Sequence, residues 1–288
     1  MFVFKKFKLD LFLFLLVFIV YVHHLSLSVY GGDVGDFLTA IVTRTVPHPS
    51  GYPLFTILGI IFSYLPFGPT IAWKVGLISA LCASFAVVLV YRISKLLIPR
   101  TVLCVIGALT IAFLYPFWLY AEVAEVFAMA VMFVVLLLYL GLLFADTKQN
   151  RYLYLLTFCF GLSLSNHLTT FLLGPLLLVL VLRANWRVLL MPKVLGTCTL
   201  LLIAGLLPYL YLPLTAHNVG YVGWGYELNT VSGFIAHVTR KVYGWTSSTP
   251  IDIQPKPLDT CVKFIHFVHS CHLLPPMLQI HPLSSNEE

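Results

Sequence analysis

Residues 126–145 read VFAMAVMFVVLLLYLGLLFA, with no charged side chain among them. A helix that crosses the hydrocarbon core of a bilayer needs about 20 predominantly apolar residues, and this stretch is long enough. Six more segments have a similar character: Leu11–Val29, Ile71–Tyr91, Val102–Tyr120, Tyr152–Ser165, Thr169–Leu182 and Val194–Leu214. The sequence therefore predicts an all-α fold, a polytopic transmembrane helix bundle of seven spans.

The composition of the whole chain excludes a water-soluble globular protein. Of the 288 residues, 60% are hydrophobic and only 10% are charged, whereas soluble domains carry roughly 25% charged residues. The net charge is +6, but the positive residues stand in small groups between the apolar runs. This distribution indicates membrane topology, so we expect no nucleic acid among the partners of the chain.

An eighth apolar segment, Leu54–Phe67, is short and runs into a proline-rich turn. If it does not cross, nearly all positive residues of the short loops fall on one side, and only Arg44 and Lys74 lie on the other. Positive residues favour the cytoplasmic side, so we predict that Leu54–Phe67 does not cross and that the N-terminus is a cytoplasmic signal anchor. The residues on the cytoplasmic side are then Lys5, Lys6, Lys8, Arg92, Lys95, Arg100, Lys148, Arg151, Arg183, Arg187 and Lys193.

The region Tyr152–Leu182 allows two interpretations. As one helix it would be roughly 46 Å long at 1.5 Å per residue, which exceeds a hydrocarbon core of about 30 Å. The polar break Ser165-Asn166-His167 favours two shorter passes that turn in the lumen. We thus expect a transmembrane module over residues 1–214, with a luminal loop at 30–70 that contains short helices. Residues 215–288 would form a short luminal tail that is irregular after about residue 250.

The luminal loop opens with Gly31-Gly32-Asp33-Val34-Gly35-Asp36. The glycine pair permits a tight turn, and a positioned carboxylate can act as a general base toward a hydroxyl group. An equally simple interpretation makes Asp33 a helix N-cap and Asp36 a partner of the helix dipole.

Further polar residues fall on the same predicted membrane face. His48 and Tyr52 stand in a loop that prolines hold rigid, and Glu122 and Glu125 stand where two spans end, a place where buried carboxylates are costly and suggest function. For each of these residues a purely structural role remains open. The full candidate set is Asp33, Asp36, His48, Tyr52, Glu122, Glu125, Asn166, His167 and Arg240.

Two cysteines and several histidines of the tail allow a metal site or a disulfide to be considered. The spacing from Cys261 to His272 matches no ordinary zinc pattern, so we expect no metal. A Cys261–Cys271 disulfide and a pair of free thiols both remain open.

Six blocks of sequence, in order over about residues 25–245, resemble one known family. They are GGDVGDFLTA at 31–40, PHPSGYPL at 47–54, AEVAEVF at 121–127, GLSLSNH at 161–167, GLLPYLYLP at 205–213, and FIAH at 234–237 followed by Tyr243-Gly244. Together they resemble the transmembrane protein 260 family, which are protein O-mannosyltransferases of the membrane-embedded GT-C glycosyltransferase class. Family members continue into a large luminal C-terminal region, so we expect this sequence to be a C-terminally truncated form.

The resemblance implies the transfer of mannose from dolichyl phosphate to Ser/Thr hydroxyls of secretory-pathway proteins at the endoplasmic reticulum membrane. The lipid-linked donor is a co-substrate, and no cofactor is implied. By the same resemblance Asp33 is the catalytic base, and the other candidates bind substrate or donor. A transporter or flippase, and an inactive truncated family member, are the alternatives.

Overall fold

The computed structural model describes residues 2–216, 224 and 228–241. Over these residues the regular structure is helical, apart from one β-bridge between Val46 and Trp224, and this confirms the predicted all-α class. The predicted irregular tail, with Cys261 and Cys271, lies outside the described residues. The helices are α1 Phe2–His24, α2 Val34–Thr43, α3 Pro53–Ser63, α4 Ile71–Leu97, α5 Thr101–Ala112, α6 Tyr115–Ala121, α7 Phe127–Thr147, α8 Asn150–Asn166, η1 Leu168–Leu173, α9 Gly174–Asn185, η2 Trp186–Leu190, α10 Pro192–Leu206, η3 Leu207–Leu210, α11 Tyr211–Thr215 and α12 Val231–Val238.

Four helical segments are long and apolar enough to cross a membrane: Ile71–Leu97, Phe127–Thr147, Leu168–Val188 and Pro192–Thr215. The bent pair α5–α6 raises this number to five if it forms one span. These segments confirm a polytopic membrane protein. Helices α1 and α8 correspond to the other two predicted spans. Neither is among the four or five segments counted above, and α8 has only 17 residues. The number seven therefore stays a prediction.

Helix α3 is the eighth apolar segment of the sequence. It has 11 residues, which corresponds to about 16 Å at 1.5 Å per residue, against a hydrocarbon core of about 30 Å. This length favours a segment that does not cross.

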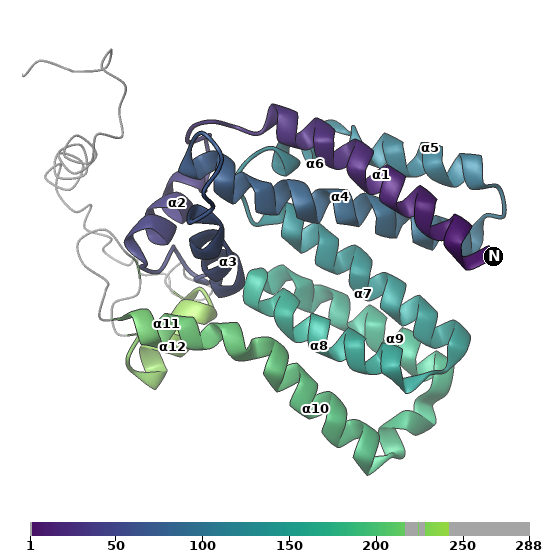
Figure 1. Ribbon diagram of the computed structural model, residues 1–288. Coiled ribbons are helices and arrows are strands. Elements are labelled where there is room, and N and C mark those ends of the chain that lie inside the picture. The colour runs from purple at the N-terminus through teal and green to yellow at the C-terminus, as the bar shows by residue number, and fades with distance from the viewer. Residues whose placement is uncertain (1, 217–223, 225–227, 242–288) are drawn as a thin grey trace, which may run out of the picture. The chain divides into compact units, whose positions relative to one another are not determined.

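The bundle is built outward from α4 (Figure 1). Helix α4 packs against α1, α5 and α7, α7 packs in turn against α8 and α9, and α8 packs against α10. Small side chains such as Ala80, Ala83 and Ala108 lie fully buried in the cluster that joins α1, α4 and α5. Close approach through small residues is how membrane helices associate, because lipid supplies no hydrophobic driving force between them.

The contact between α8 and α10 depends on two glycines. A Cβ atom on Gly161 would lie 2.5 Å from the carbonyl oxygen of Leu202, and one on Gly205 would lie 2.4 Å from that of Phe158. The two backbones therefore touch directly at this crossing.

Two predicted spans are divided in the structure. Residues 102–120 form α5 and α6, which meet at an angle of 67°, with Pro116 in the first turn of the second helix. Residues 152–182 are interrupted at His167, as predicted, and α8 and α9 each pack against α7.

The two ends of the bundle differ in what they carry. Figure 1 shows α2, α3, α11 and α12 gathered at one end, with the N-terminus of α1 at the other. At the N-terminal end, Arg92 of α4 forms an ion pair with Asp10 of α1, and its Nε donates to Asp10 Oδ1 at 2.8 Å. At the opposite end, α2 and α3 lie over the start of α4 and α7 around the buried rings of Phe37 and Phe55.

Candidate functional site

Asp33 stands at the N-cap position of α2, immediately after the glycine pair. In the part of the chain that the structure describes, its side chain makes no capping hydrogen bond. Instead the carboxylate is 57% exposed, and its Oδ2 lies 3.5 Å from Nε2 of His48. The capping interpretation is thus right about the position of Asp33 and wrong about the use of its side chain.

Glu125 lies beneath this turn and holds it in place. Its Oε1 accepts the backbone N–H of Asp33 at 3.1 Å. Gly32 has φ of 81°, which favours glycine, and a Cβ atom there would come within 3.4 Å of Oε1. The positive φ of Gly32 therefore favours glycine in the turn that places the Asp33 N–H on the buried carboxyl group.

Glu125 is only 4% exposed, and its Oε2 has no hydrogen-bond partner among the described residues. Burial, followed by the nearby Asp33 carboxylate, raises the pKa of Glu125 to about 7. A substantial fraction of this side chain is therefore protonated near neutral pH.

Asp36, one turn into α2, is joined to His48. Its Oδ2 accepts the His48 backbone N–H at 2.8 Å and lies 2.7 Å from His48 Nδ1. Its Oδ1 accepts the indole N–H of Trp224 at 3.1 Å. His48 Nε2 faces the hydroxyl group of Tyr52 at 3.1 Å. Asp36 thus forms a hydrogen-bonded cluster with the proline-rich loop and a distant segment of the chain.

An aromatic layer connects this cluster to the end of α8. The ring of Tyr52 lies 5.7 Å from that of His167, which in turn lies 5.7 Å from the ring of Phe127. Asn166 donates from Nδ2 to the carbonyl oxygen of Val126 at 3.3 Å and is fully buried, so it fastens α8 to the start of α7.

Arg240 follows α12 in a left-handed conformation, with φ of 59°. Arg240 is close enough to His167 to affect its pKa. Burial lowers the pKa of His167 most, and the charges of Arg240 and His48 lower it further. Arg240, the candidate residue that comes from the predicted tail, therefore lies near the cluster built on the first loop.

Glu122 is placed elsewhere, beside the C-terminal end of α1. Its backbone carbonyl accepts the N–H of Ser26 at 2.9 Å. Burial raises the pKa of Glu122 to about 6, and the charge of His24 opposes that shift. The structure therefore separates two glutamates that the sequence places three residues apart.

Two residues of the site, His237 and Trp224, were missed as candidates. His237 is buried on α12 close to Gly51, where a Cβ atom would lie 3.2 Å from its Nε2. Burial lowers the pKa of His237 to about 4. His237 stands in the block at 234–237 that carried the family resemblance, which is the signal that could have found it, whereas Trp224 lies outside the six blocks.

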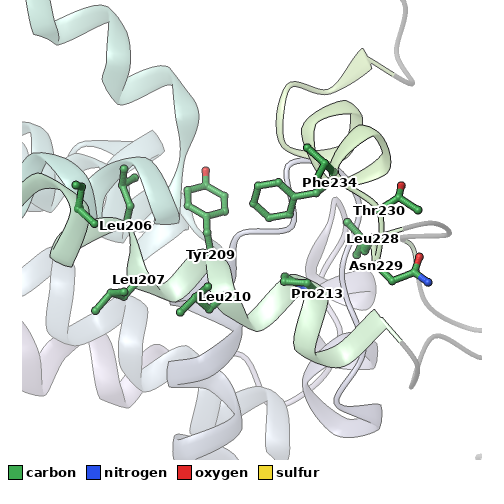
Figure 2. A pocket seen from close by; sticks show the side chains of 11 residues that line it. Leu206, Leu207, Tyr209, Leu210, Pro213, Leu228, Asn229, Thr230 and Phe234 are labelled. Carbon is green, nitrogen blue, oxygen red and sulfur yellow. The ribbon is translucent and has the colours of Figure 1, made fainter.

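An apolar groove lies beside α12 (Figure 2). It has a volume of about 420 Å³ and runs between the end of α10 with η3 and the segment that leads into α12. The rings of Tyr209 and Phe234, which both line it, meet edge to face with their centroids 6.3 Å apart. Asn229 and Thr230 add polar side chains to the lining. The apolar lining is formed by Ile203, Leu206, Leu207, Leu210, Pro213, Leu228, Val231 and Phe234.

The fold and this cluster define a polytopic α-helical membrane protein with carboxylate and histidine side chains gathered at one end of its bundle. Residues 33–190, more than half of the chain, match the family model for the N-terminal domain of the protein O-mannosyl-transferase TMEM260. The chain belongs to this family.

Two relatives agree with this assignment. The chain is 32% identical to the protein O-mannosyl-transferase tmem260 of Dictyostelium discoideum over 235 residues, which cover 75% of this chain and 28% of that protein. It is 33% identical to the protein O-mannosyl-transferase TMEM260 of Mus musculus over 235 residues, covering 75% of this chain and 32% of the relative. The chain thus spans about a third or less of the length of the relatives it matches. No solved structure matches it.

Proposed function

We propose that this chain transfers mannose from a dolichyl-phosphate-linked donor to Ser/Thr hydroxyls of proteins in the lumen of the endoplasmic reticulum. The observation that carries the proposal is the exposed carboxylate of Asp33, held on a buried polar scaffold by Glu125. The names of the family and of the two relatives favour transfer chemistry over transport.

Asp33 would act as the general base in this reaction. An exposed carboxylate can accept the proton of a Ser or Thr hydroxyl as the oxygen attacks the anomeric carbon of the sugar. The bond from that carbon to the phosphate oxygen breaks with inversion, and dolichyl phosphate leaves with the electron pair. Positioning the base matters because proximity and orientation supply much of the rate enhancement in such steps.

The groove beside α12 supports a donor with a long hydrocarbon chain. Its lining is apolar, and the same short helix carries His237 toward the carboxylate cluster. Arg240, two residues after α12, would meet the phosphate, since a guanidinium group forms strong charge-assisted hydrogen bonds with phosphate oxygens. A lipid tail in the groove would thus place the phosphate near the cluster.

The proposed reaction takes place in the lumen, so the first loop, which carries Asp33, has to face the lumen. The grouping of positive residues at the other side of the membrane supports this orientation, with the N-terminus in the cytoplasm. Acceptors would then be proteins of the secretory pathway.

The test is a transfer assay with the full chain purified in detergent, dolichyl-phosphate mannose and an acceptor domain that carries Ser/Thr residues. Asp33→Asn is expected to lower kcat at least about 100-fold, the scale of general-base catalysis. Asp146→Asn is the matched control, because Asp146 is an exposed acid at the end of α7, and it should transfer at the wild-type rate. Equal rates for wild type and Asp33→Asn would remove Asp33 from the mechanism. No transfer by the wild type would make the chain an inactive family member.

A further inference from the structure

His48 lies between two carboxylates of different exposure. Its Nδ1 is 2.7 Å from Oδ2 of Asp36, and its Nε2 is 3.5 Å from Oδ2 of Asp33. The side chain of Asp33 is 57% exposed, that of Asp36 is 26% exposed, and that of His48 is 9% exposed. The imidazole thus connects an outer carboxylate to an inner one.

The hydrogen bonds of Asp36 fix which nitrogen of His48 carries a proton. Both oxygens of Asp36 accept from N–H groups, Oδ2 from the His48 backbone and Oδ1 from Trp224. An ionised carboxylate is an acceptor only, so the nitrogen 2.7 Å from it must be the donor. Nδ1 of His48 is therefore protonated, and in the neutral imidazole Nε2 is the acceptor nitrogen, which faces Asp33 and the Tyr52 hydroxyl.

We propose that His48 is a positioning residue that takes over, at Nε2, the proton that Asp33 removes from the acceptor hydroxyl, while Asp36 stabilises the resulting imidazolium. This inference rests on the proposed function and adds a destination for the proton. It assigns to His48 and Asp36 a task other than the binding of substrate or donor.

The step balances without a further reactant. The acceptor oxygen forms its bond to the anomeric carbon, the phosphate leaves with the electron pair of the broken bond, and the hydroxyl proton goes to Asp33. The proton then moves to His48 Nε2, which restores the Asp33 carboxylate. In the imidazolium, the Nδ1 N–H donates to Asp36, and the Nε2 N–H points toward Asp33 and Tyr52. The proton on Nε2 is then lost to solvent or to the departing phosphate before the next cycle.

Other titratable groups also face His48 from neighbouring elements. Glu125 lies between α6 and α7, His167 ends α8, and His237 is on α12, and each interacts electrostatically with His48. A pH profile therefore has to be read as a difference between the wild type and a variant of His48 or Asp36.

The first experiment measures kcat and KM for the purified full chain from pH 5 to pH 9, with dolichyl-phosphate mannose as donor. His48→Asn keeps an N–H near the Nδ1 position and removes Nε2. We expect kcat to fall about 10- to 100-fold and KM to change less than about 2-fold. The part of the decline of kcat at low pH that is due to protonation of the imidazole should disappear. Asp36→Asn should lower kcat as well, because the imidazolium loses its hydrogen-bonded anionic partner.

The outcomes separate the relay from the proposed function. If the wild type transfers and His48→Asn transfers equally well, the relay is wrong and the proposed function stands. A uniform loss of rate with an unchanged pH profile makes His48 merely structural and overturns the relay as well. No transfer by the wild type at any pH would overturn the proposed function together with the relay.

A second measurement needs neither turnover nor a folded variant of Asp36. Nitrogen-15 shifts of the histidine side chains in the wild-type protein report which ring nitrogen is protonated, and the signal missing from His48→Asn identifies His48. We expect the proton on Nδ1 at neutral pH. A proton on Nε2 would overturn the proposal even if the protein is active.

Discussion

At the residue scale, the scaffold beneath Asp33 depends on one buried acid. Glu125 accepts the Asp33 backbone N–H, and Ser79 of α4 donates to its backbone carbonyl at 3.1 Å. These contacts tie the first loop to α4 and to the start of α7. Since Oε2 has no partner within the described residues, the protonated form of the side chain is the one that this environment favours.

The raised pKa of Glu125 predicts a pH-dependent stability. Between its ordinary value of 4.5 and its value of about 7 in the folded chain, the folded state holds more protons than the unfolded state. This contribution is therefore fully present below pH 4.5 and is lost as pH rises through 7. Relative to Glu125→Gln, the wild type should lose about 1–3 kcal/mol over this range, measured by thermal unfolding in detergent.

The comparison with the glutamine variant is needed because His237 has the opposite effect. Its pKa is lowered to about 4, so its contribution is lost as pH falls below its ordinary value of 6.5. Subtracting the Glu125→Gln profile leaves the Glu125 term alone. Parallel profiles for the two proteins would contradict the raised pKa, because they would show that Glu125 binds its proton equally in the folded and unfolded states.

Individual residues could be predicted from the sequence only where local pattern decides the outcome. A glycine pair followed by Asp33 after a predicted span indicated a tight turn with a carboxylate on the first loop, and the structure has both. The same reasoning gave Glu122 and Glu125 equal weight, although only Glu125 contacts Asp33. The pairing of Asp36 with Trp224 could not be predicted, because it depends on packing between segments 188 residues apart.

At the element scale, composition and geometry carry different information. The interruption at His167 is visible in the sequence, since polar residues break an apolar run there. The bend of 67° between α5 and α6 is not, because the residues around it are apolar. Proline is common in the first turn of any helix, so Pro116 indicates that a helix can begin there. It does not predict the angle between that helix and the preceding one.

The crossing of α8 and α10 predicts a sharp requirement for glycine. Gly161→Ala or Gly205→Ala places a methyl group within 2.5 Å of a backbone carbonyl oxygen of the opposite helix, so the helices must separate. We expect a loss of about 1–3 kcal/mol, measured as a lower unfolding midpoint in detergent.

Gly196 provides the matched control for this prediction. It lies on α10 like Gly205, and no atom lies within 4 Å of a Cβ atom built there. Gly196→Ala should leave the midpoint unchanged or raise it, since alanine favours helix over glycine. An equal loss at Gly196 and Gly205 would mean that the close crossing does not explain the loss.

At the scale of the whole molecule, α2, α3 and α12 lie at one end of the bundle, and the turns from α4 to α5 and from α7 to α8 lie at the other (Figure 1). The first group of elements carries the residues of the cluster, and the two turns carry positive residues such as Arg100 and Lys148. Membrane class and helical fold follow from composition, because apolar length alone forces a chain into a bilayer as helices. The assembly of the cluster does not follow from composition, since it needs the tertiary contacts of α2, α3, α8 and α12.

This polarity predicts a labelling pattern in sealed endoplasmic reticulum microsomes. Tyr30→Cys lies just before α2 and Gln149→Cys lies between α7 and α8, and both positions are exposed. A membrane-impermeant maleimide should label Gln149→Cys on intact microsomes and Tyr30→Cys only after detergent is added. The unsubstituted chain gives the background from its own cysteines. Labelling of both positions on intact microsomes would contradict a luminal first loop.

The hydrogen bond from Trp224 to Asp36, together with the bridge from Trp224 to Val46, has a consequence for synthesis of the protein. The ribosome makes roughly 5–20 residues per second, so Asp36 leaves it roughly 10–40 s before Trp224 does. During that interval the nascent chain carries its first loop without the partner that completes it. The carboxylate cluster is therefore completed late, after the preceding membrane helices have been made, and a ribosome that stalls before Trp224 leaves an inserted chain whose cluster lacks this partner.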